Sequence, residues 1–308
     1  MPPPRADILL PARGRFDLRA TVLSHAGWQL PPWDWTDGAR PVLRRAELLG
    51  DGAVRLLTIR PAPGGVALRV TGRDAAEPEV LAPLAARVRT ALQLDVDLAP
   101  FHRWCRSDVA FRPVARLGLG RLLRAPTLFE EVATTVIRVN TPPEDAARAL
   151  AALLRVGARC PWPPRLRAFP TPRLIADAGV ARLRRLGVGP RAAQIVQLAR
   201  NVVAGRCDLA ALDRHAPSRS AAVVARALDG VLGVDPEARA WLMLLLGHPD
   251  RGLVTPGSAR RLAMWAPWRG LALWWALWMQ CPRPEQARLR AALRPSVRRD
   301  PVRRSRRS

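Results

Sequence analysis

The stretch Gly118-Leu119-Gly120-Arg121-Leu122-Leu123-Arg124-Ala125-Pro126-Thr127-Leu128-Phe129-Glu130-Glu131 lies in the middle part of the 308-residue chain. After it, apolar residues recur at helical spacing, and many segments begin after a Pro, Asp, Thr or Ser of the kind that starts a helix. From about residue 95 onward, helices are predicted over 97–106, 128–139, 143–156, 172–178, 180–186, 190–204, 219–232, 236–246, 256–264 and 267–280. The connections are short, as a helical body requires.

Upstream of this stretch, short runs with alternating apolar residues predict strands over Arg15 to Leu23, Pro41 to Leu48, Ala53 to Arg60 and Val66 to Thr71. Turn-rich pieces separate them, so an antiparallel sheet follows. A helix is expected over Glu77 to Leu92. The fold class is therefore α+β, with a sheet domain at 1–95, a helical domain at 96–281 and a disordered, arginine-rich tail at 282–308.

The charge of the chain favours a polyanionic partner. There are 50 basic residues against 25 acidic ones, which gives a formal net charge of +25. A genome that favours GC-rich codons explains why the cation is arginine, but it does not explain why arginine outnumbers the carboxylates two to one. Tyrosine is absent, so base stacking would fall to Trp, Phe, His or Arg.

Several classes of chemistry are excluded or disfavoured. Lysine is absent, so no side-chain amine can form a Schiff base with a sugar aldehyde. The four cysteines are far apart in sequence and the four histidines form no spaced pair, so no metal and no cofactor is expected. The N-terminus lacks the apolar core of a signal peptide, and Leu271 to Met279 is too short to span a bilayer. A cytoplasmic, nucleoid-associated monomer is expected.

Several motifs in order resemble the helix-hairpin-helix DNA glycosylases, in the branch of 3-methyladenine and 8-oxoguanine glycosylases. The stretch 118–131 is similar to that family's G-x-G-R-x-L-R-x-P-T-x-F-E, which leads into the first helix of the helical domain. Further matches are Ala168-Phe169-Pro170-Thr171-Pro172, Arg191-Ala192, Gly205-Arg206-Cys207-Asp208-Leu209 and Trp265-Ala266-Pro267-Trp268-Arg269-Gly270-Leu271-Ala272-Leu273-Trp274. The resemblance holds from about residue 100 to 280 and implies a protein that binds double-stranded DNA.

The resemblance also implies a hairpin that grips a DNA phosphate and, about twenty residues later, a catalytic aspartate. In this register the hairpin is Leu232-Gly233-Val234-Asp235-Pro236-Glu237-Ala238-Arg239, with Asp235 in place of the second glycine. The aspartate position holds Pro256, so no catalytic residue is intact. Asp250 and Asp208 are the weak candidates for a displaced carboxylate, and a lysine-based lyase is excluded.

The residues expected to contact DNA come from three places. They are Arg138 and Asn140 in the polar turn Arg138-Val139-Asn140-Thr141, Gly233, Val234, Asp235 and Arg239 in the hairpin, and Arg260 and Arg261 at a later helix start. The late tryptophans, with Trp241, are interpreted as core packing, with room for one at the rim of a pocket.

A rival register places the hairpin at Leu186-Gly187-Val188-Gly189-Pro190-Arg191-Ala192-Ala193. Asp208 follows Gly187 by 21 residues, the right distance for a catalytic aspartate. This register would leave 219–280 as extra helices and displace the other matches. The family register is preferred, and the rival is kept open.

Three hypotheses remain at this point. The first is a DNA-binding relative of these repair enzymes that recognises alkylated or oxidised bases and has lost catalysis. The second is an active monofunctional glycosylase that uses Asp250 or Asp208. The third is an interaction protein with no DNA role, its charge set by codon bias.

Overall fold

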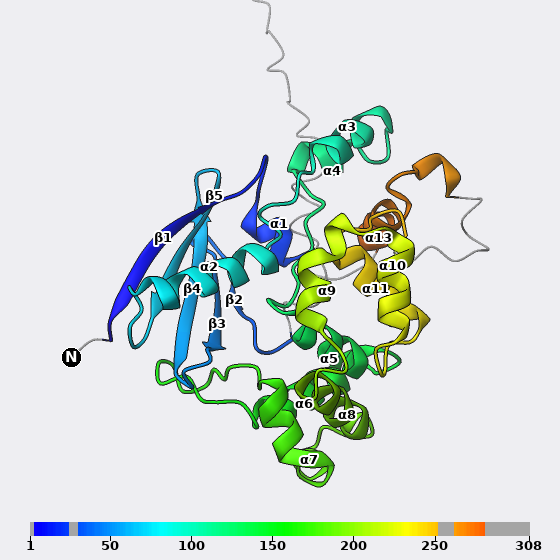
Figure 1. Cartoon of the computed structure of the whole chain (residues 1–308). Coiled ribbons are helices and arrows are strands. Elements are labelled where there is room, and N and C mark those ends of the chain that lie inside the picture. The colour runs from blue at the N-terminus through cyan, green and yellow to red at the C-terminus, as the bar shows by residue number, and fades with distance from the viewer. Residues whose placement is uncertain (1–2, 25–29, 252–261, 281–308) are drawn as a thin grey trace, which may run out of the picture.

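The computed structural model describes residues 3–24, 30–251 and 262–280, and it begins with a five-stranded sheet (Figure 1). The strands are β1 (Arg5–Pro11), β2 (Asp34–Thr36), β3 (Val42–Leu48), β4 (Val54–Ala62) and β5 (Gly65–Thr71). Their spatial order is β1-β5-β4-β3-β2, and every neighbouring pair is antiparallel. This confirms the predicted antiparallel sheet.

The two faces of the sheet are covered by different parts of the chain. Helix α2 (Pro78–Ala91) lies across one face, where Val80, Leu84 and Val88 pack on the apolar side chains of the strands (Figure 1). On the other face, Cys160, Leu166 and Ala168 pack against Ala46 and its neighbours on β3 and β4. These three residues come from the loop between α6 and α7, so the helical body reaches back beneath the sheet.

The prediction of a strand over Arg15 to Leu23 is wrong. Leu18–Val22 form the short helix α1, which begins because the Asp17 carboxylate accepts a hydrogen bond from the Ala20 backbone N–H at 2.7 Å. Alternating apolar residues in so short a run do not distinguish a strand from one turn of helix. The edge strand β1 instead comes from Arg5–Pro11, where no strand was expected.

Most predicted helices of the second half are present. They are α3 (Ala99–Ser107), α5 (Leu128–Arg138), α6 (Pro143–Leu154), α7 (Pro172–Leu186), α8 (Ala192–Val203), α10 (Ala221–Asp229), α11 (Pro236–Leu245) and α13 (Arg269–Gln280). Gly179, with φ of +70°, breaks α7 between the two helices predicted there. The short helices α4 (Arg112–Leu117) and α9 (Leu209–His215) and the 3-10 turn η2 (Ala216–Ser218) were not anticipated. The 3-10 turn η3 (Ala263–Trp265) overlaps the end of the helix predicted over 256–264, most of which lies outside the described residues.

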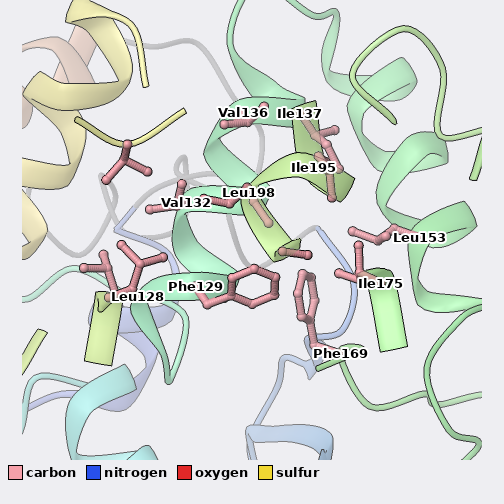
Figure 2. Close-up of a cluster of buried hydrophobic side chains, with 14 of the residues drawn as sticks. Leu128, Phe129, Val132, Val136, Ile137, Leu153, Phe169, Ile175, Ile195 and Leu198 are labelled. Atoms are coloured by element: carbon pink, nitrogen blue, oxygen red, sulfur yellow. The ribbon is translucent and has the colours of Figure 1, made fainter. Parts of the chain in front are cut away.

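Helix α5 is the centre of the helical body. It is in contact with α6, α8, α9 and α11, and nine of its eleven residues are buried. Figure 2 shows its apolar side chains inside this cluster, with Phe129 facing Phe169 edge-on at 6.4 Å between ring centroids. Because the buried residues include Glu130, Glu131 and Thr135 as well as apolar ones, the helix is enclosed on nearly all sides and carries polar groups into the core.

The fold-deciding stretch 118–131 joins the sheet to the helices. Arg121 is buried and donates hydrogen bonds to the carbonyl oxygens of Gln93, Val96 and Arg13 at 2.5 to 2.8 Å. Arg124 pairs with Asp213 at 2.8 Å, and Asp213 also accepts from the Leu128 N–H at the start of α5. The polar residues of this motif therefore hold the two parts of the molecule together.

A further apolar cluster connects α3, α4 and α13, and α13 packs back on α1. The indole N–H of Trp278 donates to the Leu23 carbonyl at 3.0 Å, and that of Trp274 donates to the Ser24 carbonyl at 3.3 Å. Trp275 and Trp278 are buried, as the packing interpretation predicts. Within the described residues, no helix combines the length and apolarity needed to cross a lipid bilayer.

Candidate functional site

A polar turn follows the C-terminal end of α5, at the expected Arg138-Val139-Asn140-Thr141. Asn140 is exposed and adopts a left-handed conformation with φ of +52°, which asparagine tolerates better than most residues. The Thr141 hydroxyl donates to the Val139 carbonyl at 3.2 Å and closes the turn before α6 begins. The structure thus presents an amide side chain at the tip of a fixed turn.

The expected hairpin connects α10 to α11 and lies against the same end of α5. Gly233 has φ of +85°, and a Cβ there would lie 3.0 Å from a methyl of Val136 on α5. Asp235 caps α11, since its carboxylate accepts from the Ala238 N–H at 2.8 Å. Arg239 pairs with Asp229 across the hairpin at 2.5 Å. The helix end that would meet a phosphate is already occupied by a carboxylate.

The rival hairpin also reaches this place. Gly187 and Gly189, between α7 and α8, have φ of +95° and +81°, and a Cβ at Gly189 would meet nothing within 4 Å. Arg191 donates to the Val139 carbonyl of the polar turn at 3.4 Å. Both hairpin sequences therefore flank the end of α5. Arg191, which matches the family's R-A pair but was not expected to contact DNA, is an additional cation at this face.

A pocket of about 430 Å³ opens between the polar turn, α6 and α11. Its volume lies within the range of small-molecule sites. The rings of Trp241 and Trp274 form one side, with centroids 4.8 Å apart. The other lining residues are Leu30, Thr135, Arg138, Val139, Thr141, Pro143, Glu144, Ala146, Ala147, Glu237 and Ala238.

Three polar features give this pocket its chemistry. Thr135 is only 3% exposed, and its hydroxyl has no hydrogen-bond partner among the described residues. Glu144 and Glu237, in the first turns of α6 and α11, are exposed carboxylates that line the pocket. Trp241 is held in place by Glu131 of α5, whose carboxylate accepts its indole N–H at 3.3 Å. The sequence had assigned Trp241 and the late tryptophans to core packing, with room for one of the latter at the rim of a pocket, and had not singled out Thr135 or Glu144.

The two candidate carboxylates have structural partners elsewhere. Asp250 accepts from the Arg269 guanidinium at 2.8 Å and from its backbone N–H, and these hydrogen bonds hold the pKa of Asp250 below its ordinary value. Asp208 is exposed and caps α9 by accepting from the Ala211 N–H at 2.8 Å. Neither residue lines the pocket. Pro256, Arg260 and Arg261 lie outside the described residues.

A larger groove, of about 910 Å³, lies at the other end of α5. Most of its charged lining residues are paired, Arg87 with Glu47, Arg89 with Asp95, and Arg124 with Asp213, whereas exposed Arg214 has no ion pair among the described residues. We therefore place the candidate site in the smaller pocket, where the hydroxyl and the two carboxylates lack such pairing among the described residues. In the same part of the chain, no three His, Cys, Asp or Glu side chains are grouped as a metal site.

The fold is that of the DNA glycosylases. The 3-methyladenine DNA glycosylase from Archaeoglobus fulgidus superposes with a TM-score of 0.64 at 19% identity, over 87% of this chain and 96% of that one. MBOgg1 in complex with a low-affinity DNA ligand gives a TM-score of 0.56 at 15% identity, over 81% and 99% of the two chains.

The Clostridium acetobutylicum 8-oxoguanine glycosylase/lyase, in complex with double-stranded DNA, gives a TM-score of 0.53 at 12% identity, over 82% of this chain and 99% of that one. No protein-family model and no curated protein matches the sequence. The fold expected from the motifs is confirmed at the level of architecture.

Proposed function

We propose that this protein binds double-stranded DNA and receives a damaged base, turned out of the duplex, in the pocket between the polar turn and α11. The shared fold supports this, as does the excess of positive charge. Asn140 would enter the duplex at the place that the base leaves, and the backbone of the two hairpin loops would face the phosphates.

The pocket favours an alkylated base that carries a positive charge. Electron-rich indole rings attract a cation above their faces, and carboxylates add to that attraction. Trp241 and Trp274 provide the rings, and Glu144 and Glu237 provide two negative charges against the single positive charge of Arg138 in the lining. This combination of two tryptophans and two carboxylates around one cavity is the observation that carries the proposal. A neutral oxidised base would gain less from it.

We further propose that catalysis by the family's aspartate is lost. Proline at position 256 offers no acid, base or charge, and Asp250 and Asp208 are engaged with Arg269 and with α9. A carboxylate that already accepts strong hydrogen bonds is a poorer base and is less free to approach the sugar. The expected outcome of lesion binding is recognition without release of the base.

A second function is favoured by the two glutamates at the pocket. In a monofunctional glycosylase, water would attack the sugar C1′ while the bond from C1′ to the base nitrogen breaks. The bonding electrons would pass to the base, and the water proton to a carboxylate. Glu237 or Glu144 could supply that carboxylate, because both line the pocket while Asp250 and Asp208 do not.

A single-turnover assay on duplexes with alkylated, oxidised and deaminated bases decides between these functions. Binding is followed in the same samples by anisotropy. Tight binding of alkylated duplex without base release supports recognition alone. Release that falls at least tenfold in Glu237→Gln or Glu144→Gln, but not in Glu79→Gln at an exposed position of α2, supports the enzyme. Equal affinity for damaged and undamaged duplex, without release, contradicts both.

A further inference from the structure

A second basic surface lies well away from the pocket, on the loop between α6 and α7 (Figure 1, in green beneath the sheet). Between Asp145 and Asp177 the sequence holds six arginines and no carboxylate. Arg148, Arg165 and Arg173 form ion pairs with Asp145, Asp34 and Asp177. Among the described residues, Arg155, Arg159 and Arg167 have no carboxylate partner.

Two of these arginines are held directly opposite each other. Arg159 and Arg167 are partners in an antiparallel bridge, flanked by the backbone hydrogen bonds Cys160 N–H to Leu166 O and Ala168 N–H to Ala158 O. This is the non-hydrogen-bonded type of pair, in which the side chains come closest. Like charges at such positions destabilise the pairing.

Alternation along the hairpin places both arginine side chains on the face away from the sheet. Cys160, Leu166 and Ala168 are buried against the sheet, so Arg159 and Arg167, one residue away, lie on the opposite face. Arg159 is exposed, and Arg167 donates one N–H to the Gly157 carbonyl at 2.8 Å. Partial burial, with Arg159 and Arg155 nearby, lowers the pKa of Arg167, which indicates positive charge that the protein leaves uncompensated.

The same hairpin presents an aromatic ring. Trp162 lies in its turn and is 44% exposed, although tryptophan is usually well covered. The hairpin itself is fixed at its tip, because Arg165 pairs with Asp34 of β2 at 2.7 Å. The end of α6 and the fixed hairpin that follows it therefore carry three arginines, Arg155, Arg159 and Arg167, and the exposed ring of Trp162.

We infer that Arg155, Arg159, Arg167 and Trp162 form a second nucleic-acid site, which binds the phosphates of an unpaired strand on the arginines and stacks one base on the tryptophan. Cationic side chains that contact the phosphates, combined with an exposed aromatic ring that stacks on a base, are what proteins use to bind single strands without sequence preference. The 12 residues of α6 separate this site from the polar turn by about 18 Å. The inference does not depend on the pocket, and it goes beyond recognition of a damaged base in a duplex.

The test uses the full chain and a labelled oligothymidylate, with anisotropy measured over a range of salt concentrations. The variant Arg155→Gln/Arg159→Gln should bind about tenfold more weakly near 0.1 M salt, and the slope of log affinity against log salt should shrink by about 1.4, from ~0.7 for each lost phosphate contact. Arg103→Gln/Arg106→Gln, two exposed arginines one turn apart on α3, is the matched control, with the same loss of charge and a smaller effect on both quantities.

Two more variants separate stacking from charge. Trp162→Ala should weaken oligothymidylate binding about tenfold while leaving the salt slope unchanged. Arg155→Lys/Arg159→Lys should restore the slope. The inference is overturned if Arg155→Gln/Arg159→Gln binds oligothymidylate as its α3 control does. It is also overturned if this variant loses affinity for undamaged duplex and keeps its affinity for oligothymidylate. Failure of the damaged-base proposal would appear separately, as equal binding of damaged and undamaged duplex.

Discussion

Asp235 occupies the position where the resemblance expects the second hairpin glycine, and its carboxylate caps α11. A cap of this kind stabilises the helix by about 1 kcal/mol, and replacement by glycine costs only a few tenths. The same carboxylate places a negative charge where a phosphate would approach the helix N-terminus. Asp235 thus stabilises the folded protein and weakens the binding of a phosphate at the N-terminus of α11.

Asp235→Gly should therefore tighten binding of undamaged duplex several-fold at low salt, with a small loss of stability. Asp208→Gly is the matched control, because it removes the same charge and the same kind of cap from α9. Anisotropy at two salt concentrations measures the difference. Equal changes in the two variants would show that the α10–α11 hairpin does not face phosphate.

Thr135 supports a second prediction at this scale. Its buried hydroxyl lacks a partner within the described residues, and an unsatisfied buried polar group costs roughly 1–3 kcal/mol. Thr135→Val should leave the free energy of unfolding unchanged or raise it by about 1 kcal/mol, and it should weaken binding of damaged duplex. Urea unfolding checks the first part, with Thr134→Val as the half-buried control. A loss of stability above about 1 kcal/mol would contradict it.

At the scale of elements, the two glycine hairpins differ in what surrounds them. Gly233 packs on Val136 of α5, whereas Gly189 has open space where a Cβ would be. Both have positive φ, which costs a non-glycine residue about 1–2 kcal/mol. Sequence spacing alone could not show that both hairpins end at one face.

Gly189→Ala should lower the free energy of unfolding by about 1 kcal/mol, from backbone strain alone. Gly233→Ala should lower it by about 2–3 kcal/mol, because Val136 must also move. Denaturant unfolding of the two variants gives the comparison. A larger loss for Gly189→Ala would mean that the α7–α8 hairpin is the more tightly packed of the two.

Elements with strong signals could be predicted from the sequence, and the pocket could not. Helical spacing in 128–139 and alternation in 66–71 reflect burial that the sequence records directly. The motif 118–131 predicted the fold because Arg121 and Arg124 hold the joint between its two parts. The pocket, by contrast, depends on Glu144 and Trp274, residues 130 positions apart that only packing brings together. A five-residue helix such as α1 carries too few residues for its period to be recognised.

At the scale of the whole molecule, one buried cluster connects the sheet to α5. Arg45 on β3 donates two hydrogen bonds to Glu130, at 2.9 and 3.1 Å, and also pairs with Glu47. Burial raises the pKa of Glu130 from 4.5 to about 7, with Glu47 as a nearby like charge. Two carboxylates thus share one guanidinium in the region where the two parts of the chain meet.

The raised pKa of Glu130 determines whether the stability of the protein rises or falls with pH. Because the folded state holds the Glu130 proton more tightly than the unfolded chain, its contribution is full below pH 4.5 and is lost as pH rises toward 7. Thermal unfolding should show a decline in stability on the order of 2 kcal/mol over that range. The Glu130→Gln variant should lack this decline, and an unchanged profile would contradict the assignment.

The contact of α13 with α1 has a consequence for synthesis on the ribosome. The carbonyls of Leu23 and Ser24 emerge early, but their partners Trp278 and Trp274 are made some 250 residues later. At the usual rate of about 5–20 residues per second, that interval lasts roughly 10–50 seconds. During this interval the Leu23 and Ser24 carbonyl groups at the end of α1 are not yet paired with α13 and are open to contact with other chains. A protein truncated before α13 would leave them exposed for its lifetime.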